Sequence, residues 1–214
     1  MNIITKIEVQ KRNKERVNIY IDNEYAFSLS AELVYKRTLK VNEKIDVEEV
    51  NKIAKEDNYL KCKDTALKIV EKSYKSEKEL KDKLLLKGYD NLSIDKAVGF
   101  LKEYNFLSDS NYARMYVKDK AKVQGKKKIK YDLMKKGIND SIIEKEILNI
   151  NKEDEEDIAY SLALKKYNIL VKRENDKYKL SQKIYRFLLS KGYDYDIVSK
   201  VIKLVINNEE IGEL

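Results

Sequence analysis

The side chains of this sequence that could do chemistry are positively charged and gathered in one segment. Residues 110–137 hold ten basic and two acidic side chains, which accounts for the whole formal net charge of +8. Seven of the basic residues are candidate contact residues, in two groups by spacing: Arg114, Lys118 and Lys122, and then Lys126, Lys127, Lys128 and Lys130. The first group recurs every four residues, so its members would share one face of a helix. The segment predicts an anion-binding surface, for nucleic-acid phosphate or an acidic groove of a partner protein.

A plainer interpretation of the basic segment is a solvated face in a lysine-rich chain. Two features favour binding: the charge is local, and the second group follows Gly125 at the predicted start of a helix. Cations there oppose the helix dipole by up to about 1 kcal/mol each, so stability alone does not favour a lysine triplet. Tyr112, Tyr116 and Tyr131 lie among the basic residues and could stack on bases, although tyrosines at helical spacing usually line a core.

Catalytic and metal-binding chemistry has little support. The chain has no histidine, which removes the commonest general base and most zinc sites. The single cysteine, Cys62, lies in a helical stretch, where a half-buried small residue is expected rather than a reactive thiol. The segment 125–128 lacks the spacing and terminal Ser/Thr of a phosphate-binding loop. The five acids of 153–157 cannot all face one ion, and they fit a solvated linker or an acid-rich first helical turn. We expect no catalytic residue, cofactor or metal.

Three glycines, Gly88, Gly137 and Gly192, share one sequence frame. Apolar residues stand eight and four positions before each glycine and six, ten and thirteen positions after it, which is the spacing of two helix faces. A lysine precedes each glycine, and an Asp or Asn suited to a helix N-cap stands two positions after it. Each glycine is therefore predicted to end one helix in the left-handed conformation before the next helix begins.

A third helix is predicted before each of these pairs, because a lone pair cannot bury both apolar faces. Ser76 and Glu79 have the spacing of a capping box at the start of the middle helix of the first unit. The interval between Gly137 and Gly192 is longer than the one between Gly88 and Gly137. It contains two charged stretches, near residues 153–157 and 172–179, which are interpreted as solvated connections. The prediction is a mainly α protein, with three tandem three-helix repeats forming an elongated curved array.

The first fifty residues have a different pattern. Alternating apolar residues in 3–9, 17–21 and 25–29, with a tight turn at Asp22–Glu24, predict a small antiparallel β-meander. Helices are expected near 31–39 and from about Val47 toward Ala66. The predicted domains are 1–57 for the β-meander and helix extension, 58–110 for the first repeat, 111–152 for the basic second repeat and 153–214 for the third. One cysteine and no membrane-length apolar run predict a cytoplasmic protein.

Three motifs occur in order along the helical part of the chain. They are Tyr74–Leu80 with Leu84 and Lys87–Gly88, then Phe106–Ala113, and then Gly125–Ile129 with Leu133 and Lys136–Ile138. Together they resemble the signatures of the RecX family, regulators of the RecA recombinase, over about residues 60–205, with a looser third copy ending at Lys191–Gly192. The β-containing start resembles the extension of longer members. The chain departs from the family pattern by lacking a proline after Gly125 and by using lysine for many arginines, which could weaken bidentate contacts.

The resemblance implies a non-enzymatic, monomeric protein that binds the RecA filament and the DNA within it, and no membrane. It implies altered filament assembly, strand exchange and the coprotease function that triggers the SOS response, in most members by inhibition. The basic second repeat alone also supports an alternative, a stand-alone DNA-binding repeat protein. A metal-dependent nuclease, the third candidate, has almost no support.

Overall fold

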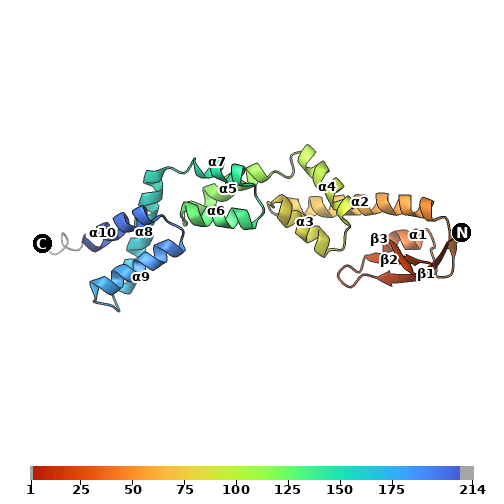
Figure 1. The fold of residues 1–214 in the computed structure, drawn as a ribbon, viewed down its shortest axis with the longest axis horizontal. Helices are drawn as coiled ribbons and strands as arrows, with labels where there is room; N and C mark the ends of the chain where they lie inside the picture. Colours follow the sequence, from red (N-terminus) through yellow and green to blue (C-terminus); the bar gives the residue numbers. More distant parts are fainter. Residues whose placement is uncertain (1, 208–214) are drawn as a thin grey trace. The chain divides into compact units, whose positions relative to one another are not determined.

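The N-terminal part of the chain is a small antiparallel sheet. The computed structural model describes residues 2–207, shown in Figure 1. The strands of the sheet are β1 (Asn2–Val9), β2 (Arg16–Ile21), β3 (Glu24–Ser30) and β4 (Lys44–Ile45), in the spatial order β3-β2-β1-β4. Helix α1 (Ala31–Lys36) lies between β3 and β4 in the sequence. Asp22 and Asn23 both adopt positive φ, 49° and 70°, as the tight turn between β2 and β3 requires. The three-strand meander is confirmed; the sequence missed β4, which has only two residues and too little pattern to detect.

The remaining elements within residues 2–207 are nine helices, three for each predicted repeat. The first repeat has the C-terminal part of α2 (Val47–Lys72), α3 (Glu77–Leu86) and α4 (Asn91–Glu103). The second has α5 (Asp109–Lys120), α6 (Lys126–Lys135) and α7 (Asp140–Ile147). The third has α8 (Lys152–Leu170), α9 (Lys177–Ser190) and α10 (Tyr195–Asn207), and the last seven positions of the predicted domain 153–214 lie outside the described residues.

The predicted frame around the three glycines fills the cores of the repeats. The residues eight and four positions before each glycine are fully buried: Leu80, Leu84, Ile129, Leu133, Ile184 and Leu188. The residues that directly follow the glycines, Tyr89, Ile138 and Tyr193, are buried as well. Each repeat has its own hydrophobic cluster, so the repeat is the packing unit that the sequence periodicity predicted.

Each of the three glycines ends its helix in the left-handed region, with φ of 85°, 78° and 86°. At the first of these turns the Gly88 N–H donates to Leu85 O at 2.9 Å, and the Tyr89 N–H donates to Leu84 O at 3.3 Å. The other two turns repeat this pair of bonds, which is the Schellman pattern. The predicted capping box of α3 is also present, with reciprocal bonds between Ser76 and Glu79.

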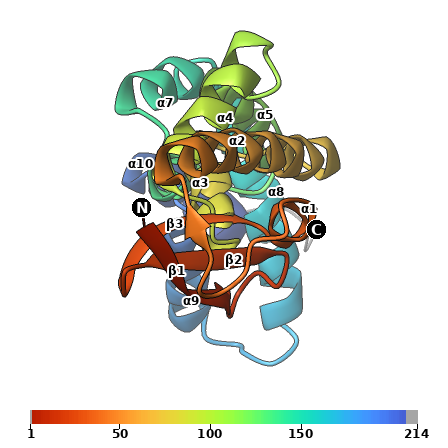
Figure 2. The same ribbon diagram turned by 90° about the vertical axis from the view of Figure 1, so that its right-hand side faces the viewer.

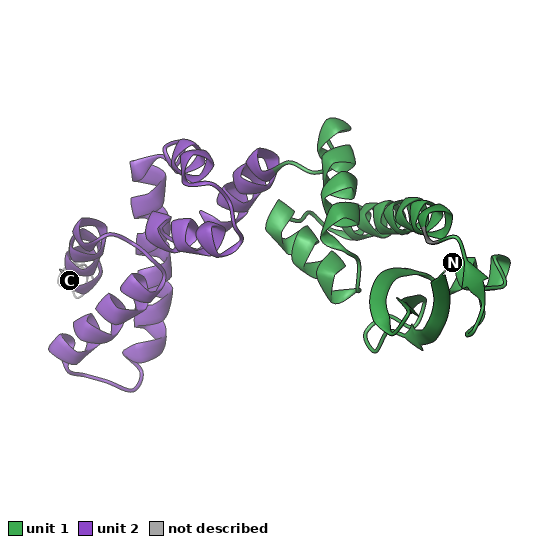
Figure 3. Ribbon diagram, turned by 45° about the vertical axis from the view of Figure 1, so that its right-hand side comes forward, with its two compact units in different colours: residues 1–108 green, residues 109–214 purple. Residues whose placement is uncertain are grey.

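The chain forms two compact units, residues 1–108 and 109–214, coloured separately in Figure 3. In the first unit, α2 serves two cores. Ala54 packs in the core of the sheet, along which α2 lies in Figure 2, and Cys62 and Ala66 pack in the first repeat. The sheet and the repeat are further joined by Arg16, which is 2 % exposed. Its Nε donates to Gly88 O at 3.1 Å and its Nη1 to Asn58 Oδ1 at 2.8 Å.

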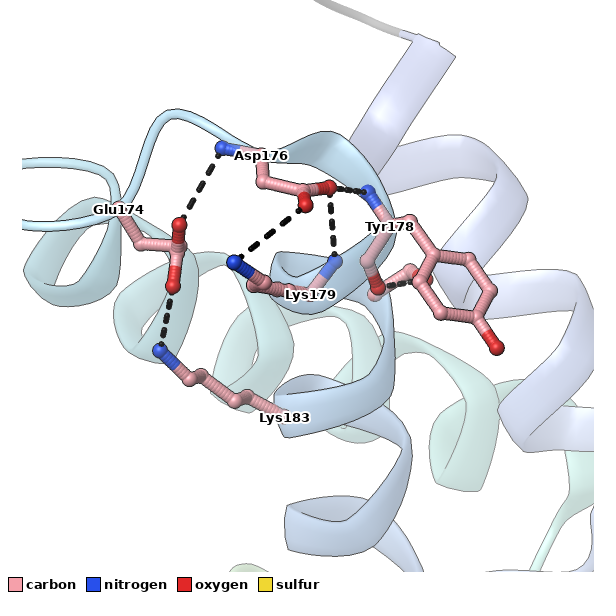
Figure 4. A network of polar contacts seen from close by, with 6 residues as sticks. Glu174, Asp176, Tyr178, Lys179 and Lys183 are labelled. Carbon is pink, nitrogen blue, oxygen red and sulfur yellow. Dashed lines mark hydrogen bonds and ion pairs between the residues drawn. The ribbon is translucent and has the colours of Figure 1, made fainter.

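Two charged segments differ from the sequence interpretation. The acids of 153–157 are not a solvated connection: they form the first turns of α8, which is the second of the two alternatives that the sequence allowed, and Glu155 is buried. The segment 172–179 is only partly a connection, because α9 begins at Lys177. Figure 4 shows how this loop is ordered: Glu174 pairs with Lys183 at 3.0 Å, and Asp176 caps α9 by accepting from the N–H of Tyr178 at 2.9 Å.

Candidate contact surface of the second repeat

The seven predicted contact residues fall into two groups according to their ion pairs. All four lysines at the start of α6 have acidic partners. The pairs are Lys126–Glu155 at 3.4 Å, Lys127–Asp194 at 2.7 Å, Lys128–Asp132 at 3.7 Å, and Lys130 with both Asp140, at 3.4 Å, and Glu144. The bonds to Asp194 and Glu144 raise the pKa values of Lys127 and Lys130. Much of the positive charge at the start of α6 is therefore neutralised within the protein.

The buried acid Glu155 explains why lysines are tolerated at this helix N-terminus. Glu155 comes from α8 in the third repeat, and its Oε1 accepts a hydrogen bond from the N–H of Lys126 at 3.0 Å. A carboxylate at this position satisfies a free N–H group and offsets the helix dipole. The neighbouring repeat thus supplies negative charge that offsets the unfavourable interaction of the lysine triplet with the helix dipole.

Gly125 has a role that the sequence did not reveal. The preceding helix α5 ends at Lys120, and Gly125 is the N-cap of α6 with φ of −81°. Its N–H donates to Lys191 O at 2.9 Å, and the N–H of Lys127 donates to Gly192 O at 3.2 Å. A Cβ on Gly125 would lie 2.4 Å from Gly192 O, so this glycine permits close contact between two repeats.

The other basic group, which we call the α5 group, has no such acidic partners within residues 2–207. The prediction that its three members share one helix face is wrong for Lys122, because α5 ends at Lys120 and Lys122 lies in the turn that follows. Arg114, Lys118 and Lys122 are all exposed. Arg114 donates to the Asn111 side chain at 2.9 Å. Within residues 2–207, Lys118 and Lys122 form no ion pair with an acidic side chain. These three cations line a groove of about 420 Å³, together with residues from the end of α7 and the start of α8. The α5 group is therefore the part of the predicted surface whose charge remains available for a partner.

The tyrosines of the second repeat lie against lysines rather than fully inside the core. The rings of Tyr112 and Tyr116 are stacked at 6.1 Å, and the Lys136 ammonium lies 5.6 Å and 5.7 Å from their centroids. Burial raises the pKa of Tyr116 to about 12, and its hydroxyl donates to Asp132 at 3.3 Å. Tyr131 is 54 % exposed, with Lys135 4.4 Å from its ring. Tyr112 and Tyr116 therefore lie at the edge of the core, whereas the ring of Tyr131 is partly exposed to solvent.

Other groups considered for chemistry are placed as follows. Cys62 is fully buried, and burial raises its pKa to about 12. In the part of the chain that the structure describes, no three acidic, cysteine or histidine side chains are grouped as metal ligands. No described helix is long and apolar enough to cross a membrane.

Comparison with known proteins defines the class of protein. The model of the regulatory protein RecX N-terminal domain matches residues 2–46. The models of the first, second and third RecX three-helix domains match residues 62–101, 108–146 and 153–202. The order and positions of these domains agree with a sheet followed by three helical repeats.

Whole-chain relatives give the same result. Proteins named regulatory protein RecX from Clostridium beijerinckii and Clostridium perfringens strain 13 are 55 % and 54 % identical to this chain. The first alignment covers 95 % of both chains, and the second covers 98 % of this chain and 99 % of the relative. A crystal structure of regulatory protein RecX matches with a TM-score of 0.66 at 25 % identity, over 94 % of this chain and 98 % of the other. The chain belongs to the RecX family of regulatory proteins.

Proposed function

We propose that this protein binds the RecA recombinase filament and inhibits its recombinase and coprotease activities, as a monomeric, non-enzymatic regulator in the cytoplasm. Its membership of the RecX family supports regulation of RecA, and the two relatives described above are named regulatory proteins. The observation that carries the proposal at the level of residues is the α5 row of three exposed cations, Arg114 and Lys118 on α5 and Lys122 in the turn after it, which has no acidic partner within residues 2–207.

The α5 row is suited to an anionic partner. Arg114 and Lys118 lie about one helical turn apart on α5, about 6 Å along the axis at 1.5 Å per residue, and Lys122 lies in the turn that follows the helix. Lys118 and Lys122 have no ion pair within residues 2–207 to break before they bind, and Arg114 would give up only its hydrogen bond to the Asn111 side chain. Held beside DNA phosphates within a filament, the second repeat would bridge neighbouring recombinase subunits or exclude an incoming duplex. Either action would inhibit strand exchange.

The test is binding to preformed RecA filaments, measured by co-sedimentation, together with DNA-stimulated ATP hydrolysis and strand exchange. The wild-type protein should bind filaments and inhibit both reactions in a concentration-dependent way. A variant with Arg114, Lys118 and Lys122 all changed to Glu should bind at least tenfold more weakly. The matched control changes Lys145, Lys165 and Lys203 to Glu, three exposed lysines of the same unit outside the groove, and should bind like the wild type. A wild-type protein that fails to bind filaments would refute the proposal.

The alternative function, stand-alone DNA binding, is favoured by the same α5 row. It predicts tight binding to bare duplex DNA in the absence of recombinase, with a steep salt dependence. Loss of three phosphate contacts in the α5 variant would reduce the slope of log K against log salt by up to about 2.7, at about 0.9 per contact. Weak binding of the wild-type protein to bare DNA at physiological salt would exclude this alternative.

A further inference from the structure

A cavity in the first unit is lined both by the sheet and by the first repeat. We call it the Arg16 cavity; it has a volume of about 420 Å³, and all of its lining residues lie within residues 1–108. They come from the turn before β2, the first residue of β2, the junction of β3 with α1, the middle of α2, and the residue after Gly88. Small-molecule sites usually have volumes of roughly 300–1,000 Å³, so this cavity is large enough for a small ligand.

Arg16 brings to this cavity a buried positive charge that is not neutralised. Its Nε and Nη1 donate to Gly88 O and Asn58 Oδ1, which are uncharged oxygens. The third nitrogen, Nη2, is buried and has no hydrogen-bond partner among the residues that the structure describes. Burial lowers the pKa of the guanidinium, although an arginine stays protonated in proteins. Since buried cations and donors are normally paired, Arg16 has an unmet need for a negatively charged acceptor.

The acidic side chains that act on Arg16 through their charge are engaged elsewhere. Asp57 and Asp90 both favour the charged form of the guanidinium. Asp57 accepts a hydrogen bond from the N–H of Ser30 at 3.2 Å. Asp90 caps α4 by accepting from the N–H of Ser93 at 2.9 Å. Within residues 2–207 neither acid forms an ion pair with Arg16, so the fold supplies compensation only at longer range.

The charges around the cavity favour a ligand with a single negative charge. Three basic and two acidic side chains line it, a net charge of 3 − 2 = +1: they are Lys14, Arg16, Lys61, Glu15 and Glu32. Lys61 and Glu32 pair with each other. Lys14 is exposed and forms no ion pair within the described residues, so its charge is available to a ligand. A monoanion would leave the lining neutral, whereas a phosphate dianion would leave an excess of negative charge.

The guanidinium of Arg16 is held in one orientation. Besides its two hydrogen bonds, its central carbon lies 4.7 Å from the centroid of the Tyr89 ring, which also lines the cavity. The Tyr89 hydroxyl is itself fixed by Thr65 at 2.8 Å and by Lys61 O at 3.2 Å. A preorganised donor loses little conformational freedom on binding. Nη2 is closed to solvent, so an oxygen of a ligand reaches it only after a small movement of neighbouring side chains.

We propose that the Arg16 cavity binds a carboxylate group, with Nη2 of Arg16 as its hydrogen-bond donor and the Lys14 ammonium as a second cation. A carboxylate carries the single charge that balances the lining, and its oxygens accept charge-assisted hydrogen bonds from arginine. The group belongs either to a free small organic acid or to an acidic residue of the recombinase, and the chemistry is the same for both. The cavity lies in the first unit and the α5 row in the second, so the inference goes beyond the proposed function.

The test is an NMR titration of the isotope-labelled full chain with sodium acetate, with sodium chloride at the same ionic strength as the reference. Acetate should shift the Nε–H signal of Arg16 and the amide signals of residues 13–16 and 30–32 in a saturable way, and chloride should not. Inorganic phosphate should bind more weakly than acetate. Shifts that do not saturate, or that chloride reproduces, would show that the cavity holds only solvent and would overturn the proposal. Tighter binding of phosphate would overturn the assignment to a carboxylate.

Two variants locate the binding. Lys14→Gln should weaken acetate binding by about two- to fivefold, the effect of one exposed charge. The matched control is Lys11→Gln, which removes the same charge from an exposed position between β1 and β2 that does not line the cavity, and it should bind like the wild type. Arg16→Lys keeps the charge but lacks the planar fork, and it should weaken binding by about tenfold or more. If Arg16→Lys does not fold, the lysine pair decides alone: equal affinities of Lys14→Gln and Lys11→Gln would overturn the site.

A competition experiment identifies the source of the carboxylate. The wild-type protein is co-sedimented with preformed RecA filaments in saturating acetate and in chloride of equal ionic strength. Reduced filament binding in acetate would assign the carboxylate to the recombinase, and unchanged binding would assign it to a free acid. A protein that binds no filament refutes the proposed function alone, because the acetate titration is made without recombinase.

Discussion

Replacing Gly125 by alanine should destabilise the second unit, although nothing in the backbone conformation of this residue forbids a side chain. Its φ and ψ of −81° and 165° lie in the extended region that alanine adopts freely. The conflict is with the neighbouring repeat: the new Cβ would lie 2.4 Å from Gly192 O and 2.6 Å from Tyr193 N. Both are backbone atoms of a glycine-ended turn, so neither can move aside as a flexible side chain would.

The size of the effect follows from the contacts that would be lost. Forcing an extra group into a closely packed site costs about 1–3 kcal/mol. Separating the two backbones also breaks the hydrogen bonds from Gly125 N to Lys191 O and from Lys127 N to Gly192 O, at about 1 kcal/mol each. The expected loss is about 3–5 kcal/mol, a large part of the ~5–15 kcal/mol stability of a typical domain. In a unit of about one hundred residues this lowers the Tm by more than roughly 10 °C.

The assay is urea and thermal unfolding of the full chain, with amide hydrogen exchange to localise the change to residues 109–207. Gly125→Ser is the informative second variant: serine is a better N-cap than glycine, so its loss of stability would have to come from the collision. The control is Gly99→Ala in α4, where no atom lies within 4 Å of the new Cβ, and it should be neutral or stabilising by about 0.5–1 kcal/mol. If Gly125→Ala is as stable as Gly99→Ala, the close contact between the repeats is refuted.

Three further predictions concern single residues. Gly137→Val should destabilise the second repeat by about 1–3 kcal/mol, because a β-branched residue is strained at φ of 78°. Gly137→Asn should recover part of this loss, because Asn tolerates positive φ better. Equal unfolding midpoints for the two variants would contradict the prediction. Hydrogen bonds from Lys36 and Lys61 lower the pKa of Glu32 to about 2, so the stability from this carboxylate is present above its unfolded pKa and is lost as pH falls toward 2. A carboxyl NMR titration should show this low pKa and its rise in Lys61→Ala; an ordinary pKa in the wild type would disprove the pairing. Cys62, with its pKa raised to about 12, should react with a thiol reagent only after unfolding, and rapid reaction of the native protein would show that it is accessible.

Much of the fold could be predicted because it follows from local periodicity. The spacing around Gly88, Gly137 and Gly192 determines both the buried helix faces and the left-handed turns, and all three glycines have positive φ. Ser76 and Glu79 lie within one helical turn, so their capping box is also a local feature. The short strand β4 was missed because its pairing with β1 depends on a distant segment and not on its own two residues. The domain boundaries at 57, 110 and 152 stay predictions.

The candidate site was only partly predictable, because charge on a side chain and charge available to a partner are different quantities. The sequence gives Lys126, Lys127 and Lys118 equal weight. In the structure Lys126 and Lys127 pair with acids of the third repeat, whereas Lys118 has no ion pair within the described residues. No local pattern indicates such partners, since an ion pair depends on the distance between groups far apart along the chain.

The sequence by itself determined a protein of helical repeats with its positive charge in the second repeat, and its motifs resemble those of the RecX family. Composition and spacing are enough for this, because helix faces and turns are set over a few residues. Only the tertiary structure decided that the lysine triplet is largely neutralised, that Gly125 is required by the Gly192 carbonyl, and that Arg114, Lys118 and Lys122 line a groove together with residues of α7 and α8. These features arise where separate helices meet, and the free energy of burying or pairing a group depends on what surrounds it there.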